Sequence, residues 1–116
     1  MSPMATTALI TEFDAADAEI TQHLETCRAA ARAMNALGAL ASRVQGAAQD
    51  AEFDASAPKQ RQPLLNLLQR TGFVNLRSGE LATRLRDIHQ GLMDLRGDVR
   101  AARAAFTTPP ATGGSD

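Results

Sequence analysis

The sequence predicts an all-α protein: a long antiparallel helical hairpin. We expect two copies of the hairpin to dimerise into a coiled-coil-like four-helix bundle. Two stretches of helix-forming residues, about 7–50 and 63–106, carry apolar residues at helical spacing. A segment with turn-forming residues separates them, and two helices of similar length joined by a short loop favour a hairpin. We expect one domain over 7–106, with disordered segments at 1–6 and 107–116.

The first predicted helix, 7–50, has no Pro and is rich in Ala, Glu, Gln, Arg and Leu. Its larger apolar residues recur mostly every three or four positions, but the spacing slips between residues 34 and 40. Gly38 and Gly46 would each cost about 1 kcal/mol in a helix interior. We interpret both as places where a partner backbone comes close.

The stretch 51–63 is the predicted connection between the helices. Asp54, Ser56 and Pro58 are residue types that favour turns. Pro63 suits the first turn of the second helix, because a proline lacks the N–H that an initial helical turn leaves unpaired.

The second predicted helix, 63–106, contains a regular heptad pattern. Its apolar residues fall at 81, 85, 88, 92, 95, 99, 102 and 106, so the steps alternate between four and three. Gly72 could end a short helix, with Ser78 capping another. The same register nevertheless extends back through Ser78 and Thr71, which favours one continuous helix.

Antiparallel pairing is predicted between residues whose numbers add to about 113. This would place Leu24 near Ile88 and Leu37 near Leu76. Residues 1–57 carry three basic and eight acidic side chains, a net charge of −5, and residues 58–106 carry nine and four, a net charge of +5. The hairpin would therefore bring opposite charges together.

A two-helix hairpin leaves one side of the heptad pattern without a partner, which predicts that another helix binds there. We expect a non-catalytic protein–protein interaction module that forms a homodimer as an adaptor or structural protein. Replacing Leu92 by Asp should then break the association. The predicted partner-binding residues are Leu81, Leu85, Ile88, Leu92, Leu95, Val99 and Phe106.

Catalytic chemistry is not expected. Glu19, His23 and Cys27 share a helix face at i, i+4 and i+8, but no second cluster of metal ligands accompanies them. His89 has no phosphotransfer motif around it, and no phosphate-binding glycine motif is present. We expect no enzyme activity, metal, cofactor or small-molecule substrate.

Nucleic-acid binding is a second alternative, because residues 58–106 are basic. The arginines spread around the helix, however, and the near absence of aromatic residues removes base stacking, so we do not favour it. The single cysteine and the absence of a signal peptide or a long apolar run lead us to expect a cytoplasmic protein that does not enter membranes.

The segment 75–97, NLRSGELATRLRDIHQGLMDLRG, resembles the C-terminal helix of the FlgN-type flagellar export chaperones. Asn75, Gly79 and Leu81 match an Asn-x-x-Asn-Gly-x-Leu pattern, in which Ser78 replaces the second Asn. LRDIHQGLM is also similar to type III secretion needle subunits, which are helical hairpins. Each resemblance covers about a quarter of the chain. The first implies a small chaperone or antiactivator regulator that masks a client helix along 81–106.

Overall fold

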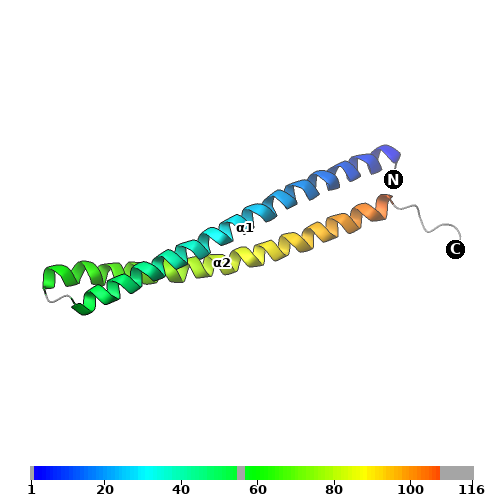
Figure 1. Ribbon diagram of the computed structural model, residues 1–116. Helices are drawn as coiled ribbons and strands as arrows, with labels where there is room; N and C mark the ends of the chain where they lie inside the picture. Colours follow the sequence, from blue (N-terminus) through cyan, green and yellow to red (C-terminus); the bar gives the residue numbers. More distant parts are fainter. Residues whose placement is uncertain (1, 55–56, 108–116) are drawn as a thin grey trace. The chain divides into compact units, whose positions relative to one another are not determined.

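The computed structural model describes residues 2–54 and 57–107, and this part of the chain is an all-α helical hairpin (Figure 1). Helix α1 spans Pro3–Asp54 and helix α2 spans Pro58–Thr107. No strand occurs among the described residues. The predicted all-α helical hairpin is confirmed, and its dimerisation into a four-helix bundle stays a prediction. The predicted disorder of 107–116 falls, after Thr107, outside the described residues.

Helix α1 begins at Pro3, four residues before the predicted start at Thr7. The Ser2 hydroxyl oxygen accepts a hydrogen bond from the backbone N–H of Ala5, at 3.1 Å. Ser2 is therefore an N-cap, and Pro3 takes the first helical position, where a proline is favoured. The Ser-Pro pair is the sequence signal for this earlier start.

The connection between the helices is shorter than the predicted 51–63. Helix α1 continues to Asp54 and α2 starts at Pro58, so Pro58 rather than Pro63 takes the first turn. The Ala57 carbonyl accepts hydrogen bonds from the N–H groups of Gln60 and Arg61, at 3.0 and 3.2 Å. These bonds establish the helix before Pro63, which lies inside α2.

Helix α2 runs without a break through Gly72 and Gly79, which confirms the prediction of one continuous helix. Thr71 and Ser78, the two polar residues on the extended register, are both buried. The Thr71 hydroxyl donates to the Leu67 carbonyl at 2.9 Å, and the Ser78 hydroxyl donates to the Asn75 carbonyl at 3.1 Å. Each hydroxyl thus has a partner within its own helix, which makes its burial acceptable.

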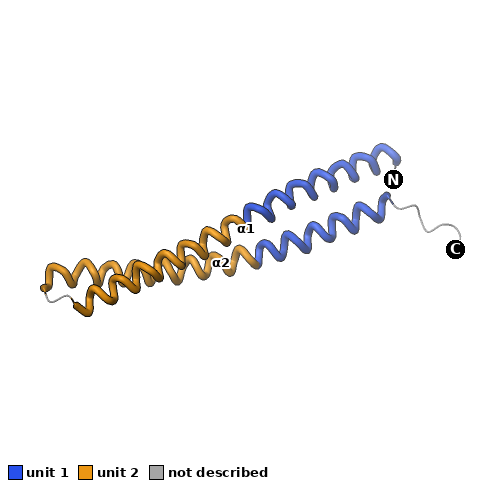
Figure 2. The backbone as a smooth tube through the Cα atoms, viewed as in Figure 1, with its two compact units in different colours: residues 1–27, 87–116 blue, residues 28–86 orange. Residues whose placement is uncertain are grey.

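Both helices contribute to two compact units (Figure 2). Unit 1 consists of residues 1–27 and 87–116, and unit 2 consists of residues 28–86. In each unit a segment of α1 packs antiparallel against a segment of α2. The two units are described separately below.

The interior of unit 1 is built around Ile20 and Leu24, whose side chains are 6% and 2% exposed. Arg96, Arg100 and Arg103 of α2 contact Thr21, Asp17 and Asp14 of α1, so the numbers in each pair add to 117. Helical side chains point back toward the N-terminus of their helix. The arginines therefore reach about one turn toward lower numbers, and the backbone pairing stays close to the predicted sum of 113.

The interior of unit 2 is built from small residues. Ala41, Ala48 and Ala82 are buried together with Thr71 and Ser78. Small side chains on both helices allow the backbones to approach closely, but they bury little apolar area. The inward positions of α1 in this unit keep the alternating spacing at 34, 38, 41, 45 and 48.

The slip predicted between residues 34 and 40 does not occur, because Gly38 and Ala41 take the inward positions. Leu37 and Leu40 are 41% and 47% exposed, and Leu76 is 61% exposed. The side chains of Leu37 and Leu76 are therefore not part of the buried interior, although the register that sets them near one another agrees with Gly38, where a Cβ atom would lie 3.4 Å from Asn75 Oδ1. Because leucine is more apolar than glycine or alanine, a prediction based on apolarity places Leu37 and Leu40 in the interior, where the structure has Gly38 and Ala41.

Gly38 lies close to side chains of the partner helix, whereas Gly46 does not, and at neither glycine is a partner backbone atom the near neighbour. A Cβ atom at Gly38 would lie 3.3 Å from Ser78 Oγ and 3.4 Å from Asn75 Oδ1, both across the helix pair. At Gly46, a Cβ atom would meet nothing within 4 Å. Only Gly38 is required by the packing of unit 2.

Candidate helix-binding surface

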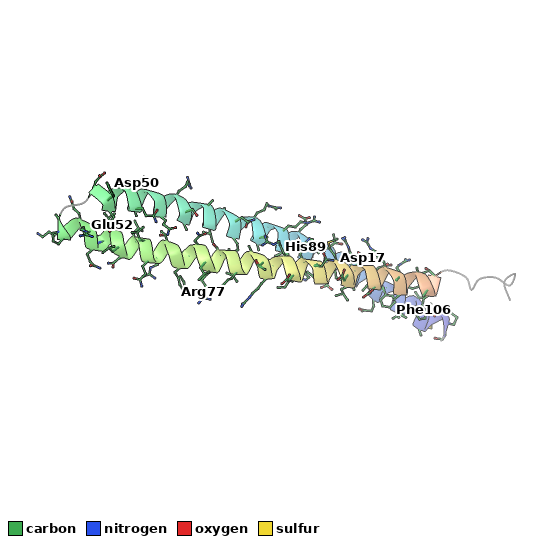
Figure 3. The ribbon with its side chains drawn as sticks, turned by 90° about the horizontal axis from the view of Figure 1, so that it is seen from below. Asp17, Asp50, Glu52, Arg77, His89 and Phe106 are labelled. Carbon is green, nitrogen blue, oxygen red and sulfur yellow. The ribbon has the colours of Figure 1, made fainter. Side chains whose placement is uncertain are left out.

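The predicted partner-binding residues divide into two groups in the structure. Leu85, Leu92 and Val99, at heptad positions a, are half-buried toward α1. Leu81, Ile88 and Leu95, at positions d, are 46%, 54% and 49% exposed. We call this second group the d line. Phe106, the last residue of the pattern, is 45% exposed near the end of α2 (Figure 3).

Helix α2 faces α1 through positions a and e in unit 1, so the a residues predicted to bind a partner helix lie toward α1 instead. The half-buried residues of α2 in this unit are His89, Leu92, Arg96, Val99, Ala102 and Arg103. All but Ala102, which is at position d, alternate in steps of three and four. Two arginines and a histidine thus occupy inward positions, and two apolar residues of the d line stay outside.

Cross-helix ion pairs connect this side of α2 to α1. The Arg100 guanidinium donates through Nε to Asp17 Oδ2 at 2.7 Å and through Nη2 to Asp17 Oδ1 at 3.1 Å (Asp17 is labelled in Figure 3). Arg103 forms a second ion pair, with Asp14. These bidentate contacts hold the arginine side of α2 against α1.

The ion-paired arginines lie at different angles from the d line. Arg100 follows Leu95 by five residues, which corresponds to about 140° around a helix axis, and Arg103 follows it by eight, about 80°. Ile88 and Leu95, the two residues of the d line that belong to unit 1, stay exposed.

In unit 1 the ion pairs shift the pKa values of the groups that form them. The hydrogen bonds from Arg100 hold the pKa of the Asp17 carboxyl below its usual 3.8, with smaller contributions from the charges of Arg100 and Arg96. The same bonds raise the pKa of Arg100, and Asp14 raises that of Arg103. The ionised forms stabilise one another, which is the behaviour of structural ion pairs.

The apolar interior is thin compared with the apolar surface that stays exposed. Five apolar residues are buried among the described residues, and three of them are alanines. The larger exposed apolar residues also include Leu65, Leu67 and Phe73 of α2. A contiguous row of exposed apolar side chains is typical of surfaces that bind another protein.

The residues considered for chemistry do not converge. Glu19 and His23 are exposed and Cys27 is half-buried. Within residues 2–54 and 57–107, no three His, Cys, Asp or Glu side chains are grouped so as to hold a metal ion. No helix in the described part of the chain is long and apolar enough to cross a membrane.

A shallow depression on α2 is lined by Asn66, Gln69, Arg70 and Phe73. The Arg77 guanidinium lies over the Phe73 ring, 5.4 Å from its centroid. This lining holds no carboxylate, histidine or thiol that could serve as a general base or nucleophile. The depression lies on unit 2, and its residues differ from those of the d line.

No protein-family model, no curated protein and no solved structure matches this chain. The resemblances to export chaperones and needle subunits thus have no support from these comparisons.

The contacts that Arg96, Arg100 and Arg103 make with α1 were not predicted from the sequence. A signal was present: the three arginines recur at helical spacing, and Thr21, Asp17 and Asp14 recur at matching spacing in reverse order on the first helix. In an antiparallel pair these two sets must lie side by side. Reading them together would have identified which side of α2 faces α1.

Proposed function

We propose that the chain is a non-catalytic helix-binding protein that self-associates through its d line. The observation that carries the proposal is the exposure of Leu81, Ile88 and Leu95, each about half accessible in a protein whose interior is small. Burial of apolar surface is the main driving force for association between helices. A second copy supplies the same line and so covers it without any other partner.

The row is regular enough to receive a helix along its length. The three side chains are seven residues apart, which is two helical turns, so they form a stripe rather than scattered points. The scattered exposed leucines of α2, such as Leu65 and Leu76, do not share this stripe. The proposal therefore distinguishes residues of equal exposure by their position around the helix.

The test compares two double variants, each of which replaces two exposed aliphatic side chains of equal size by Gln. Ile88→Gln/Leu95→Gln alters the d line, and Leu65→Gln/Leu76→Gln alters exposed leucines on other sides of α2. Light scattering with refractive-index detection gives the native mass, since the chain has no Trp or Tyr for absorbance. We expect the wild type and the control variant to be dimers and the d-line variant to be a monomer.

Circular dichroism of the same samples checks that the hairpin persists, which we expect because the replaced side chains are exposed. Equal native masses for the d-line and control variants would reject the proposal. Leu92→Asp, which the sequence suggested as a test of association, is less suitable because Leu92 is half-buried toward α1. That change would damage the hairpin itself.

An export-chaperone or regulator role is the alternative outcome of this experiment. In that case the wild-type chain is a monomer that binds a hydrophobic dye, and the d-line variant binds less dye than the control. The d line would then wait for a client helix rather than a second copy.

A further inference from the structure

The two most exposed large apolar side chains of α2 are Phe73 and Leu76 of unit 2, at 56% and 61%. The buried residues Thr71 and Ser78 mark the side of α2 that faces α1. Phe73 and Leu76 are each two residues from one of these markers and five from the other, which corresponds to about 140° to 160° around the helix. The two side chains therefore point away from α1, and the hairpin cannot cover them.

The apolar patch formed by Phe73 and Leu76 is short and separate from the d line. The two residues precede Leu81 by eight and five positions, which corresponds to about 80° and 140° around the helix. One heptad before and after, the same two positions hold polar residues: Asn66, Gln69, Glu80 and Thr83. The patch therefore lacks the heptad repeat along which a second helix would pack.

Two arginines border this patch. Arg77 and Arg70 are four and three residues from Phe73, which corresponds to about 40° and 60° around the helix. The Arg77 guanidinium lies over the Phe73 ring, 5.4 Å from its centroid, and the side chain points away from α1 in Figure 3. Both arginines are exposed. We call Arg70, Phe73, Leu76 and Arg77 the outer face.

The acidic side chains near the outer face neutralise it only in part. Arg77 pairs with Glu80 at 3.0 Å, and the two side chains are 57% and 42% exposed. An ion pair this exposed contributes little, so another anion can replace Glu80 as the partner of Arg77. Arg70 has no acidic partner in the part of the chain that the structure describes.

The net charge of unit 2 belongs to its α2 segment. Residues 58–86 carry six basic side chains and one acidic side chain, Glu80, a net charge of +5. Residues 28–54 of α1 carry three of each and have no net charge. The outer face therefore lies on a strongly cationic helix segment, which favours an anionic partner.

We propose that the outer face binds the surface of a bilayer that contains anionic lipids. Arg70 and Arg77 pair with lipid phosphate groups, and Phe73 and Leu76 enter the boundary between headgroups and acyl chains. Helix α2 lies along the bilayer surface and does not cross it. This interaction is independent of self-association through the d line.

The shape of the outer face favours a bilayer over a macromolecule. A bilayer is flat and deformable, so it needs neither a groove nor a heptad repeat to receive one turn of apolar side chains on a convex helix. A nucleic acid would pair with the arginines through its phosphates. It would leave the aliphatic side chain of Leu76 without an apolar environment.

The first test measures the apolar contribution by sedimentation of the full chain with vesicles. Phosphatidylcholine vesicles with about one third phosphatidylglycerol are compared with pure phosphatidylcholine vesicles. Phe73→Gln/Leu76→Gln alters the outer face, and Phe53→Gln/Leu40→Gln makes the same replacements at exposed positions of α1 in unit 2. We expect the wild type and the control to bind the anionic vesicles only, and the outer-face variant to bind them about tenfold more weakly.

The second test measures the contribution of charge. Arg70→Gln/Arg77→Gln should weaken binding to the anionic vesicles about tenfold or more, whereas Arg32→Gln/Arg43→Gln, with the same change in net charge on exposed positions of α1, should change it much less. Glu80→Gln should strengthen binding, because it removes the acidic partner of Arg77. Wild-type binding should fall as salt rises from about 50 to about 500 mM.

Circular dichroism checks that the variants keep their helices, which we expect because the replaced side chains are exposed. Three results would overturn the inference. No wild-type binding at about 1 mM anionic lipid, together with salt-sensitive binding of a DNA duplex that Arg70→Gln/Arg77→Gln abolishes, would assign the arginines to a nucleic acid. Equal vesicle binding by the outer-face and control variants would show that another surface contacts the lipid.

The third contradicting result is a native mass that falls from dimer to monomer in Phe73→Gln/Leu76→Gln, because the outer face would then bind a second copy. The native mass of the d-line variant separates this inference from the proposed function. A monomeric wild type that binds anionic vesicles would reject self-association and leave the bilayer contact standing.

Discussion

Gly38 is the residue at which the packing of unit 2 depends most directly on the absence of a side chain. Its neighbours across the helix pair are Ser78 and Asn75, and the Ser78 hydroxyl already donates to the Asn75 carbonyl. A methyl group at Gly38 would lie 3.3 Å from Ser78 Oγ, so the Ser78 side chain must move by a few tenths of an ångström, whereas Asn75 Oδ1 at 3.4 Å is in ordinary contact. Gly46 meets no such obstacle.

This difference predicts unequal effects of alanine at the two glycines. Gly46→Ala should raise the free energy of unfolding by up to about 1 kcal/mol, because alanine is the better helix former. Gly38→Ala should gain clearly less or lose stability. Thermal melts followed by circular dichroism measure both, and an equal gain at the two sites would show that Gly38 is not tightly packed.

Asp17 gives a prediction about pH. Its pKa is lower in the folded protein than the usual 3.8, so the Arg100 contact stabilises the fold above pH 3.8. That contribution is lost as the pH falls through the lower folded-state pKa, where the carboxyl becomes protonated. Asp17→Asn should therefore melt below the wild type near neutral pH, and the two melting temperatures should converge well below pH 3.8.

The measurement is a pair of melting curves at neutral and strongly acidic pH. The size of the neutral difference should shrink with added salt, since both partners are exposed. A difference between the two proteins that stays constant across this pH range would contradict the assigned role of the Arg100 contact.

At the scale of the helices, Leu24 makes a larger contribution than any exposed leucine. Its side chain is 2% exposed, against 61% for Leu76. Leu24→Ala should destabilise the hairpin by about 2 to 5 kcal/mol, the usual cost of removing a buried leucine, whereas Leu76→Ala should change stability little. Chemical unfolding of the two variants checks this, and similar losses would show that unit 1 is not organised around Leu24.

The existence and type of both helices were predictable from the sequence, and their ends were predictable only in part. Continuity through Gly72 and Gly79 followed from the register kept by Thr71 and Ser78. The start at Pro58 was missed because Pro63 offered an equally good first turn. Only the hydrogen bonds made by the Ala57 carbonyl show that the helix is already formed before Pro63.

The sequence predicts which residues share one side of α2, but not which of them face α1 and which stay exposed. Heptad spacing identifies Leu81 to Phe106 as one side of a helix, about 100° wide or more. It does not say which edge of that side meets α1. The side that meets α1 carries ion pairs between residues that are 83 and 89 positions apart in the chain, and local periodicity carries no information about such contacts.

For the whole molecule, the small interior and the exposed apolar surface both favour association. A chain of 116 residues with five buried apolar residues among those described has little internal apolar stabilisation. Association through the d line would bury apolar side chains that the hairpin itself leaves exposed. Small helical proteins commonly gain stability by this route.

The most direct test of this account is the native mass of the wild-type chain, measured by light scattering with refractive-index detection over a range of concentrations. The account predicts a mass of twice 12.3 kDa that falls toward 12.3 kDa on dilution. A mass of 12.3 kDa at every concentration would contradict it, because the exposed d line would then have no second copy to cover it.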